Sequence, residues 1–176
     1  PVAAIDIERG IPTGYTPKLV VDNGVVAFAG GRGYREHMKG ETLKMVGLRA
    51  KDGEILWEAP HYPAGHAGSP EDLLVVDGLV WCGKIAGGKH SGIFTGRDPK
   101  TGQIKREFTP DVETYWFHHR CYRAKATDEY ILASRTGIEF VDVRERSWET
   151  HHWVRGACTY GILPCNGLVY APPHPC

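Results

Sequence analysis

Residues 73–88 read LLVVDGLVWCGKIAGG, in which two short apolar runs flank Asp77-Gly78. Residues 91–110, SGIFTGRDPKTGQIKREFTP, repeat this plan around Lys100-Thr101-Gly102. Short β-branched runs on either side of a turn that contains glycine are typical of antiparallel β-hairpins. The two stretches therefore predict four consecutive strands that are joined as two hairpins.

The same double hairpin recurs before and after this region. Equivalent turns follow one another about every 48 residues, and a repeat of about 40–50 residues with four short strands is typical of a β-propeller blade. A β-sandwich of meanders is the alternative, but it does not explain why long and short connections alternate. The first-hairpin turns lie at Asn23, Asp77, Asp128 and Asn166, and the second-hairpin turns at Asp52, Thr101 and Arg146.

The predicted fold is all-β, a β-propeller fragment with about three and a half four-stranded blades. Each blade buries its faces only against its neighbours, so an open arc would expose apolar edges. We therefore expect the remaining blades in a longer chain, or another chain as partner; a closed four-bladed propeller is the alternative. The predicted parts are a lead-in at residues 1–16 and blades at about 17–64, 65–111, 112–154 and, in part, 155–176.

The bulk composition excludes some classes of function. Lys plus Arg and Asp plus Glu number 21 each among the 176 residues, so the formal net charge is zero. A general nucleic-acid binder would carry a basic excess. No apolar run approaches the roughly 20 residues that a membrane span needs. The chain starts at Pro1 without a signal peptide, which indicates a mature form or a piece of something longer.

Two outer hairpins carry a family resemblance. The segments GLRAKDGEILWEAP (residues 47–60) and FTGRDPKTGQIKREF (residues 94–108) resemble the D-x-x-TG-x-x-x-W repeat of PQQ-like, or quinoprotein dehydrogenase-like, β-propellers. The resemblance covers about residues 17–176, and residues 117–176 are further similar to uncharacterised bacterial PQQ-binding-like propellers. Trp57 matches the repeat's tryptophan, which packs between blades; Phe108 approximates this position, and Trp148 lies near it in the third unit.

The resemblance implies a fold rather than an activity, together with a periplasmic or extracellular location. The family contains quinoprotein oxidoreductases as well as non-catalytic scaffolds, such as the outer-membrane assembly propeller. A PQQ enzyme surrounds its quinone with polar residues and a calcium site, usually beside an adjacent Cys-Cys disulfide. This sequence has no Cys-Cys pair and no acidic cluster at the predicted site, so bound PQQ is not supported and the cofactor stays unknown.

The propeller pattern also predicts which residues share one face. Connections that lead into first strands and those that follow second strands lie at one end of the blades, at the mouth of the central channel. The first-hairpin turns lie at the opposite end, where Asp22, Asp77, Lys100 and Glu145 form an ordinary solvated set. A neutral protein with a cationic mouth favours an anionic ligand. The predicted mouth collects His66, His90, His118, His119, Arg120, Arg135, Arg155, Cys158, Tyr160, His174 and Cys176.

These residue types suit a carboxylate ligand, bound with or without catalysis. In a catalytic site His118 or His119 would be the base and Tyr160 the acid, as in uronate elimination from a carbohydrate. Arginines clamp carboxylates. A non-catalytic scaffold or interaction propeller is the rival class, and a quinoprotein oxidoreductase is the third. The predicted ligand-binding residues are Arg120, Arg135, Arg155 and His66.

A metal ion is a further alternative at the same end. Cys158, His174 and Cys176 are close enough in sequence to contribute ligands, and the proline-rich end at residues 172–176 is stiff. The competing interpretation is that the cysteines belong to small buried cores. His118-His119 could likewise bind a metal or make buried and anion-binding contacts, because adjacent residues on an extended strand point to opposite sides.

Overall fold

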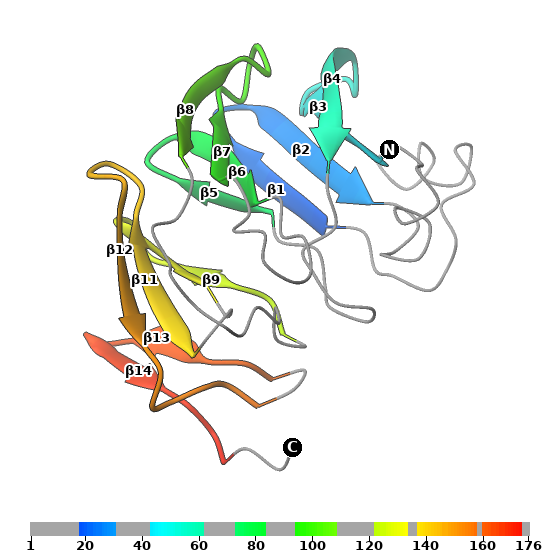
Figure 1. Cartoon of the computed structure of the whole chain (residues 1–176). Helices are drawn as coiled ribbons and strands as arrows, with labels where there is room; N and C mark the ends of the chain where they lie inside the picture. The colour runs from blue at the N-terminus through cyan, green and yellow to red at the C-terminus, as the bar shows by residue number, and fades with distance from the viewer. Residues whose placement is uncertain are drawn as a thin grey trace.

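A computed structural model describes residues 18–30, 43–61, 73–83, 94–108, 122–133, 137–157 and 160–173. These residues form strands and turns without a helix, and they build three four-stranded antiparallel sheets and one two-stranded sheet (Figure 1). The all-β prediction is therefore confirmed. The first two sheets contain β1 (Lys18–Asp22), β2 (Val25–Gly30), β3 (Leu43–Arg49), β4 (Ile55–His61), β5 (Leu74–Val76), β6 (Leu79–Gly83), β7 (Phe94–Arg97) and β8 (Ile104–Phe108). The others contain β9 (Lys125–Ala126), β10 (Tyr130–Ala133), β11 (Ile138–Asp142), β12 (Ser147–His151), β13 (Leu163–Cys165) and β14 (Leu168–Tyr170).

The first-hairpin turns lie where the sequence predicted them. Asn23 and Gly24 both have positive φ, at 47° and 77°, between the paired residues Asp22 and Val25. Two central residues with positive φ match the right-handed twist of the flanking strands. Asn166-Gly167 repeats this geometry in the β13–β14 hairpin.

The outer turns use an aspartate to hold their backbone. Asp98 Oδ1 accepts hydrogen bonds from the backbone N–H groups of Lys100 and Thr101, both at 2.9 Å. Asp142 Oδ1 does the same for Arg144 and Glu145. These bonds explain why the DPKTG and DVRER stretches turn rather than continue as strands.

Successive sheets pack face to face and bury a core between each pair. The first strands contact one another in chain order, β1 with β5, β5 with β9 and β9 with β13. This places the first strands around a common axis, with the later strands of each sheet farther out. We propose that each sheet lies within one of the predicted blade ranges. The buried residues shared between the first two sheets include Ala27, Met45, Trp57, Leu73 and Val80.

Trp57 packs between sheets as predicted, and Phe108 and Trp148 lie near, but not at, the equivalent positions of their sheets. Trp57 on β4 pairs with Gly47 in the register, and the residue that pairs with the equivalent Gly96 is Arg106 rather than Phe108. Both glycines lie beside the same register shift, and Trp57 follows Gly47 at the same spacing as Arg106 follows Gly96, so Phe108 lies two residues beyond the equivalent position. In the third sheet the corresponding position is Glu149, one residue beyond Trp148.

The second sheet compensates for this change by supplying its tryptophan from another strand. Trp81 on β6 pairs with Gly96 and is 1% exposed, and its indole Nε1 donates to the Val76 carbonyl oxygen at 3.0 Å. A Cβ on Gly96 would lie 2.7 Å from Trp81 Cζ2. A glycine in the third strand is thus required wherever an indole lies across it.

Both ends of the described arc expose apolar residues. Leu19 and Val21 on β1 are 46% and 61% exposed, whereas Leu73 and Val75, their equivalents in the second sheet, pack into the core that it shares with the first. At the other end, Leu163, Leu168 and Tyr170 are 59%, 60% and 50% exposed. The described residues therefore form part of a propeller whose two end faces have no neighbouring sheet, as the sequence predicted for an open arc.

Candidate functional site

Every long connection in the described sheets leaves from the same end of the strands. The short turns at Asn23-Gly24 and around Gly53 close the opposite end of the first sheet, so the segments before β1, between β2 and β3, and after β4 start from one side. The other four-stranded sheets have the same order. We name this side the loop-bearing end and the other the turn end.

Most of the predicted site residues lie in these connections and outside the described residues. Arg155 and Tyr160, both in the connection from β12 to β13, are the predicted site residues that the structure describes. Arg155 is half-buried and interacts with another residue, whereas Tyr160 is 82% exposed. The predicted residues outside the described ranges are His66, His90, His118, His119, Arg120, Arg135, Cys158, His174 and Cys176.

Tyr122 joins two connections at the loop-bearing end. Its side chain is 1% exposed, and its Oη donates a hydrogen bond to the Gly137 carbonyl oxygen at 3.4 Å. Tyr122 Oη also accepts a hydrogen bond from the Gly156 N–H at 3.3 Å. A buried hydroxyl that both donates and accepts is satisfied and fixes its partners. The backbone after β10 and the backbone after β12 are therefore held against the same side chain.

Glycines allow this close packing around Tyr122. Gly161 has φ of 70°, and a Cβ there would lie 2.7 Å from Tyr122 Cδ2. A Cβ on Gly156 would lie 2.6 Å from the Gly161 carbonyl carbon. The Gly161 N–H also donates to the Ala157 carbonyl oxygen at 2.8 Å. This tight turn presents Tyr160 to solvent directly beside a fixed backbone.

Glu139 is a buried carboxylate that the sequence did not single out as a site residue. It is 0% exposed on β11, one residue after the strand begins at the loop-bearing end, and it is engaged by a polar or electrostatic partner. Buried carboxylates are rare unless they are paired. Its place inside the apolar run IEFVD was the only sequence signal.

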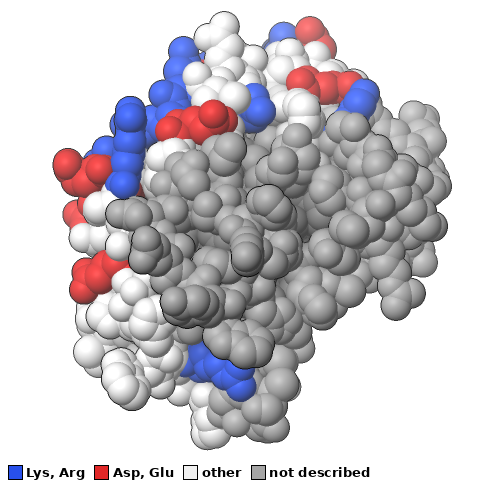
Figure 2. Space-filling model, in the orientation of Figure 1, with Lys and Arg blue, Asp and Glu red and all other residues white. Residues whose placement is uncertain are grey.

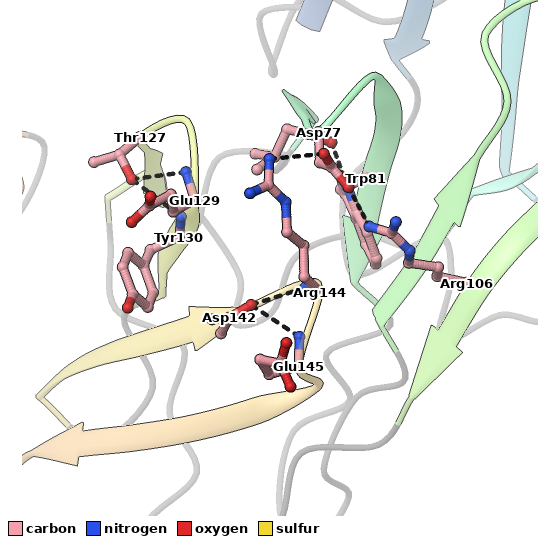
Figure 3. A network of polar contacts seen from close by, with 10 residues as sticks. Asp77, Trp81, Arg106, Thr127, Glu129, Tyr130, Asp142, Arg144 and Glu145 are labelled. Carbon is pink, nitrogen blue, oxygen red and sulfur yellow. Dashed lines mark hydrogen bonds and ion pairs between the residues drawn. The ribbon is translucent and has the colours of Figure 1, made fainter.

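At the turn end, Lys100 and Glu145 are exposed as predicted, but Asp77 is part of an ion-pair network. Asp77 lies between two arginines from different sheets, because Arg106 of β8 binds one carboxylate oxygen and Arg144 of the β11–β12 turn binds the other at 2.9 Å (Figure 3). The Asp77 side chain is 23% exposed. The pKa of Asp77 is lowered, first by the Arg106 hydrogen bond and then by Arg144, and the pKa of Arg144 is raised by Asp77. Figure 2 shows charges of both signs over these outer turns.

The described residues hold no cluster that could bind a metal ion. Within the described ranges, no three His, Cys, Asp or Glu side chains lie close enough to share a metal ion. Among the same residues, a helix that could cross a membrane is not found.

Comparisons with known proteins bear on the fold alone. No protein-family model matches the sequence, and no curated protein matches it either. The solved structure of BamB from Moraxella catarrhalis is similar, with 16% identity and a TM-score of 0.54 over 89% of this chain and 44% of the BamB chain. A quinohemoprotein alcohol dehydrogenase from Pseudomonas putida has 16% identity and a TM-score of 0.46 over 71% of this chain and 18% of its own. This chain therefore spans less than half the length of either structure.

The sheet order, the contacts between first strands and the likeness to BamB define a β-propeller. The chain therefore provides part of a β-propeller whose fold is similar to that of BamB.

Proposed function

We propose that the chain is part of a β-propeller that binds a small anionic ligand at its loop-bearing end. The observation that carries this proposal is the pair of hydrogen bonds made by Tyr122. Its oxygen contacts the backbone two residues after Arg135 and one residue after Arg155. Tyr122 thus holds two backbone segments close together at this end, and each segment lies next in sequence to one of the predicted arginines. Guanidinium groups bind carboxylates through charge-assisted, often bidentate hydrogen bonds.

The proposed ligand is a uronate-type carbohydrate. The formal net charge of the chain is zero, so attraction of an anion needs a local cluster of positive charge. The exposed Tyr160 ring offers an apolar face and a hydroxyl in the same connection as the half-buried Arg155. A sugar acid presents the matching chemistry, a carboxylate next to a ring with hydroxyl groups.

The proposed reaction, if the site is catalytic, is elimination beside the carboxylate. His118 or His119 takes the proton from the carbon next to the carboxylate, and the bond from the neighbouring carbon to the leaving oxygen breaks. Tyr160 gives its proton to that oxygen, so a double bond forms and no oxidant is needed. The arginines neutralise the negative charge that develops on the carboxylate.

A scaffold or interaction propeller is the second candidate, and the apolar end faces favour it. Leu19 and Val21 at one end and Leu163, Leu168 and Tyr170 at the other are exposed where further sheets would pack. In this candidate, the remaining blades or another chain cover these faces and the loop-bearing end has no ligand. We further propose a periplasmic or extracellular location, which rests on the resemblance of the repeat.

Calorimetric titration with a trigalacturonate and with a neutral trisaccharide tests the proposal. We expect the uronate to bind and the neutral sugar not to bind. Arg155→Gln should weaken binding roughly tenfold, the effect of one lost charge-assisted contact. Lys100→Gln, at the turn end, should not weaken it. Circular dichroism of both variants must match that of the parent chain. Absence of uronate binding, or equal loss in the two variants, would favour the scaffold.

A further inference from the structure

The innermost strand of the third sheet carries two positive charges. Arg123 leads into β9, and Lys125 is the first residue of that strand. We infer that these two side chains form a second anion-binding site, on the inner edge of the third sheet, which takes another carboxylate of the ligand. The inference rests on the proposed function and narrows it, because a ligand with two carboxylates is an oligouronate rather than a single sugar acid.

Arg123 is a half-buried arginine without a polar partner. It lies between Tyr122 and Ala124, which are 1% and 3% exposed. Its Nε is buried and makes no hydrogen bond, and the part of the chain that the structure describes supplies its guanidinium with no ion pair. Arginines that are withdrawn from water are normally paired with an anionic group. A bound carboxylate would satisfy this guanidinium.

Lys125 stands at a position where the first two sheets have apolar residues. It lies three residues before the first-hairpin turn of its sheet, as Val20 and Leu74 do in theirs. Val20 and Leu74 pack against the cores between sheets. Lys125 is half-buried, and among the described residues its ammonium has no hydrogen-bond or ion-pair partner. A residue that breaks the local pattern in this way, without compensation in the fold, is typical of a functional site.

The strand register shows which face of the third sheet carries Lys125. Lys125 pairs with Leu132, so both side chains lie on one face, and Leu132 shares a core with Ile162 just before β13. The buried Glu139 does not neutralise this face. Glu139 pairs with Ala133, which packs in the core shared with the second sheet, so the carboxylate lies on the opposite face from Lys125.

The inner strands supply almost no negative charge to balance the two cations. Among the described inner strands β1, β2, β5, β6, β9, β10, β13 and β14, the one acidic residue is Asp22, which precedes the turn at the turn end. β9 contacts β5 and β13, and neither of these strands has an acidic residue (Figure 1). The positive potential of Arg123 and Lys125 therefore favours an anion at this place.

Tyr122 connects this pair of cations to the proposed ligand site. Arg123 follows Tyr122 in the chain, and Arg155 precedes Gly156, whose N–H donates to Tyr122 Oη. Arg155 lies at the loop-bearing end, and β9 runs from that end toward the turn end. A chain of sugar acids that enters at the loop-bearing end would therefore present one carboxylate to Arg155 and the next to Arg123.

Calorimetric titration with mono-, di- and trigalacturonate tests the inference. We expect the parent chain to bind the di- and trigalacturonate roughly tenfold more tightly than the monosaccharide, the gain from one additional charge-assisted contact. Arg123→Gln and Lys125→Leu should remove most of this preference and leave the affinity for monogalacturonate unchanged. Arg146→Gln is the matched control, because it removes an exposed arginine at the turn end. It should leave both the preference and the affinity unchanged.

Thermal unfolding separates a binding role of Lys125 from a structural one. Lys125→Leu restores the residue type of Val20 and Leu74, so without ligand its melting temperature should exceed that of the parent chain. Trigalacturonate should raise the melting temperature of the parent more than that of the variant. A lower melting temperature of Lys125→Leu without ligand would overturn the inference, because the ammonium would then stabilise the fold itself.

The titrations also distinguish failure of this inference from failure of the proposed function. If the parent chain binds none of the three galacturonates, both are contradicted. If it binds all three with equal affinity, the second anion-binding site is contradicted and the proposed function stands. The same holds if Arg123→Gln and Lys125→Leu retain the preference of the parent for the longer ligands.

Discussion

The indole Nε1 of Trp57 donates a hydrogen bond to the carbonyl oxygen of Pro99 at 2.7 Å, which joins the first sheet to the second. Trp57 also lies against Gly102, where a Cβ would stand 2.6 Å from its ring. At the next interface Arg106 occupies the equivalent position and binds Asp77 instead. Equivalent positions in the first and second sheets thus make different contacts: Trp57 packs against the next sheet, and Arg106 forms an ion pair with Asp77.

Replacing Trp57 should lower the free energy of unfolding more than any substitution at the Arg106–Asp77 ion pair. Trp57→Ala removes a side chain that is 8% exposed and leaves a cavity, so the free energy of unfolding should fall by about 3–5 kcal/mol. Trp57→Phe keeps most of the packing and loses the bond to Pro99, so it should cost less. Urea denaturation followed by circular dichroism measures both. Equal losses for the two variants would mean that the hydrogen bond, not packing, dominates.

Gly96 should tolerate no side chain while Trp81 lies across it. Gly96→Ala places a methyl group 2.7 Å from the buried indole, which must shift against its own core. Overpacking of this kind costs about 1–3 kcal/mol. Thr95→Ala is the control, because the Thr95 hydroxyl bonds only an exposed glutamate in the described contacts. Thermal unfolding of the two variants compares them directly, and a stable Gly96→Ala protein would contradict the packing described above.

The Asp77 network should make stability depend on pH only in acid. The folded pKa of Asp77 lies below its ordinary 3.8 because Arg106 and Arg144 bind the carboxylate. Its contribution is therefore complete above pH 3.8 and declines as the pH falls through the lower folded value. Asp77→Asn keeps a residue that tolerates the positive φ of 49°. Melting temperatures of parent and variant should differ at neutral pH and converge as the pH falls through the lowered folded pKa of Asp77. A constant difference down to pH 2 would exclude this carboxylate as the cause.

The Tyr122 hydroxyl should order the connection that carries Arg155 and Tyr160. Tyr122→Phe leaves the ring packing and removes the oxygen shared by Gly137 and Gly156, at a cost of about 1 kcal/mol. Hydrogen exchange at the Gly156 amide should accelerate, whereas exchange in the first two sheets should not change. Uniform acceleration across all sheets would indicate a global loss of stability rather than a local role.

Local patterns predicted most of the fold. Turns such as Asn23-Gly24 and Asn166-Gly167 depend on residues that accept positive φ, so they can be recognised without tertiary context. The exchange of Trp57 for Arg106 could not be recognised in this way. It depends on Trp81, which a neighbouring strand places across Gly96, and this is a tertiary effect.

The candidate site was predictable only as far as topology extends. Alternating long and short connections place Arg155 and Tyr160 at the loop-bearing end from sequence alone. The role of Tyr122 was missed because a tyrosine ahead of a short strand carries no local signal for a contact with Gly137 or Gly156. Likewise, Asp77 was expected to be solvated, since the sequence does not show that Arg144 of the next sheet reaches it.

The most direct measurement is a crystal structure of the chain with a bound trigalacturonate, from which the positions of Arg120, Arg135 and Arg155 are read. An anion-binding mouth predicts that the three guanidinium groups lie within about 8 Å of one another, the range over which charges interact at physiological ionic strength. It also predicts the sugar carboxylate among them, with His118 or His119 beside the adjacent carbon. Guanidinium groups on different faces, or paired instead with Glu139 and Asp142, would contradict it and leave a structural salt-bridge network.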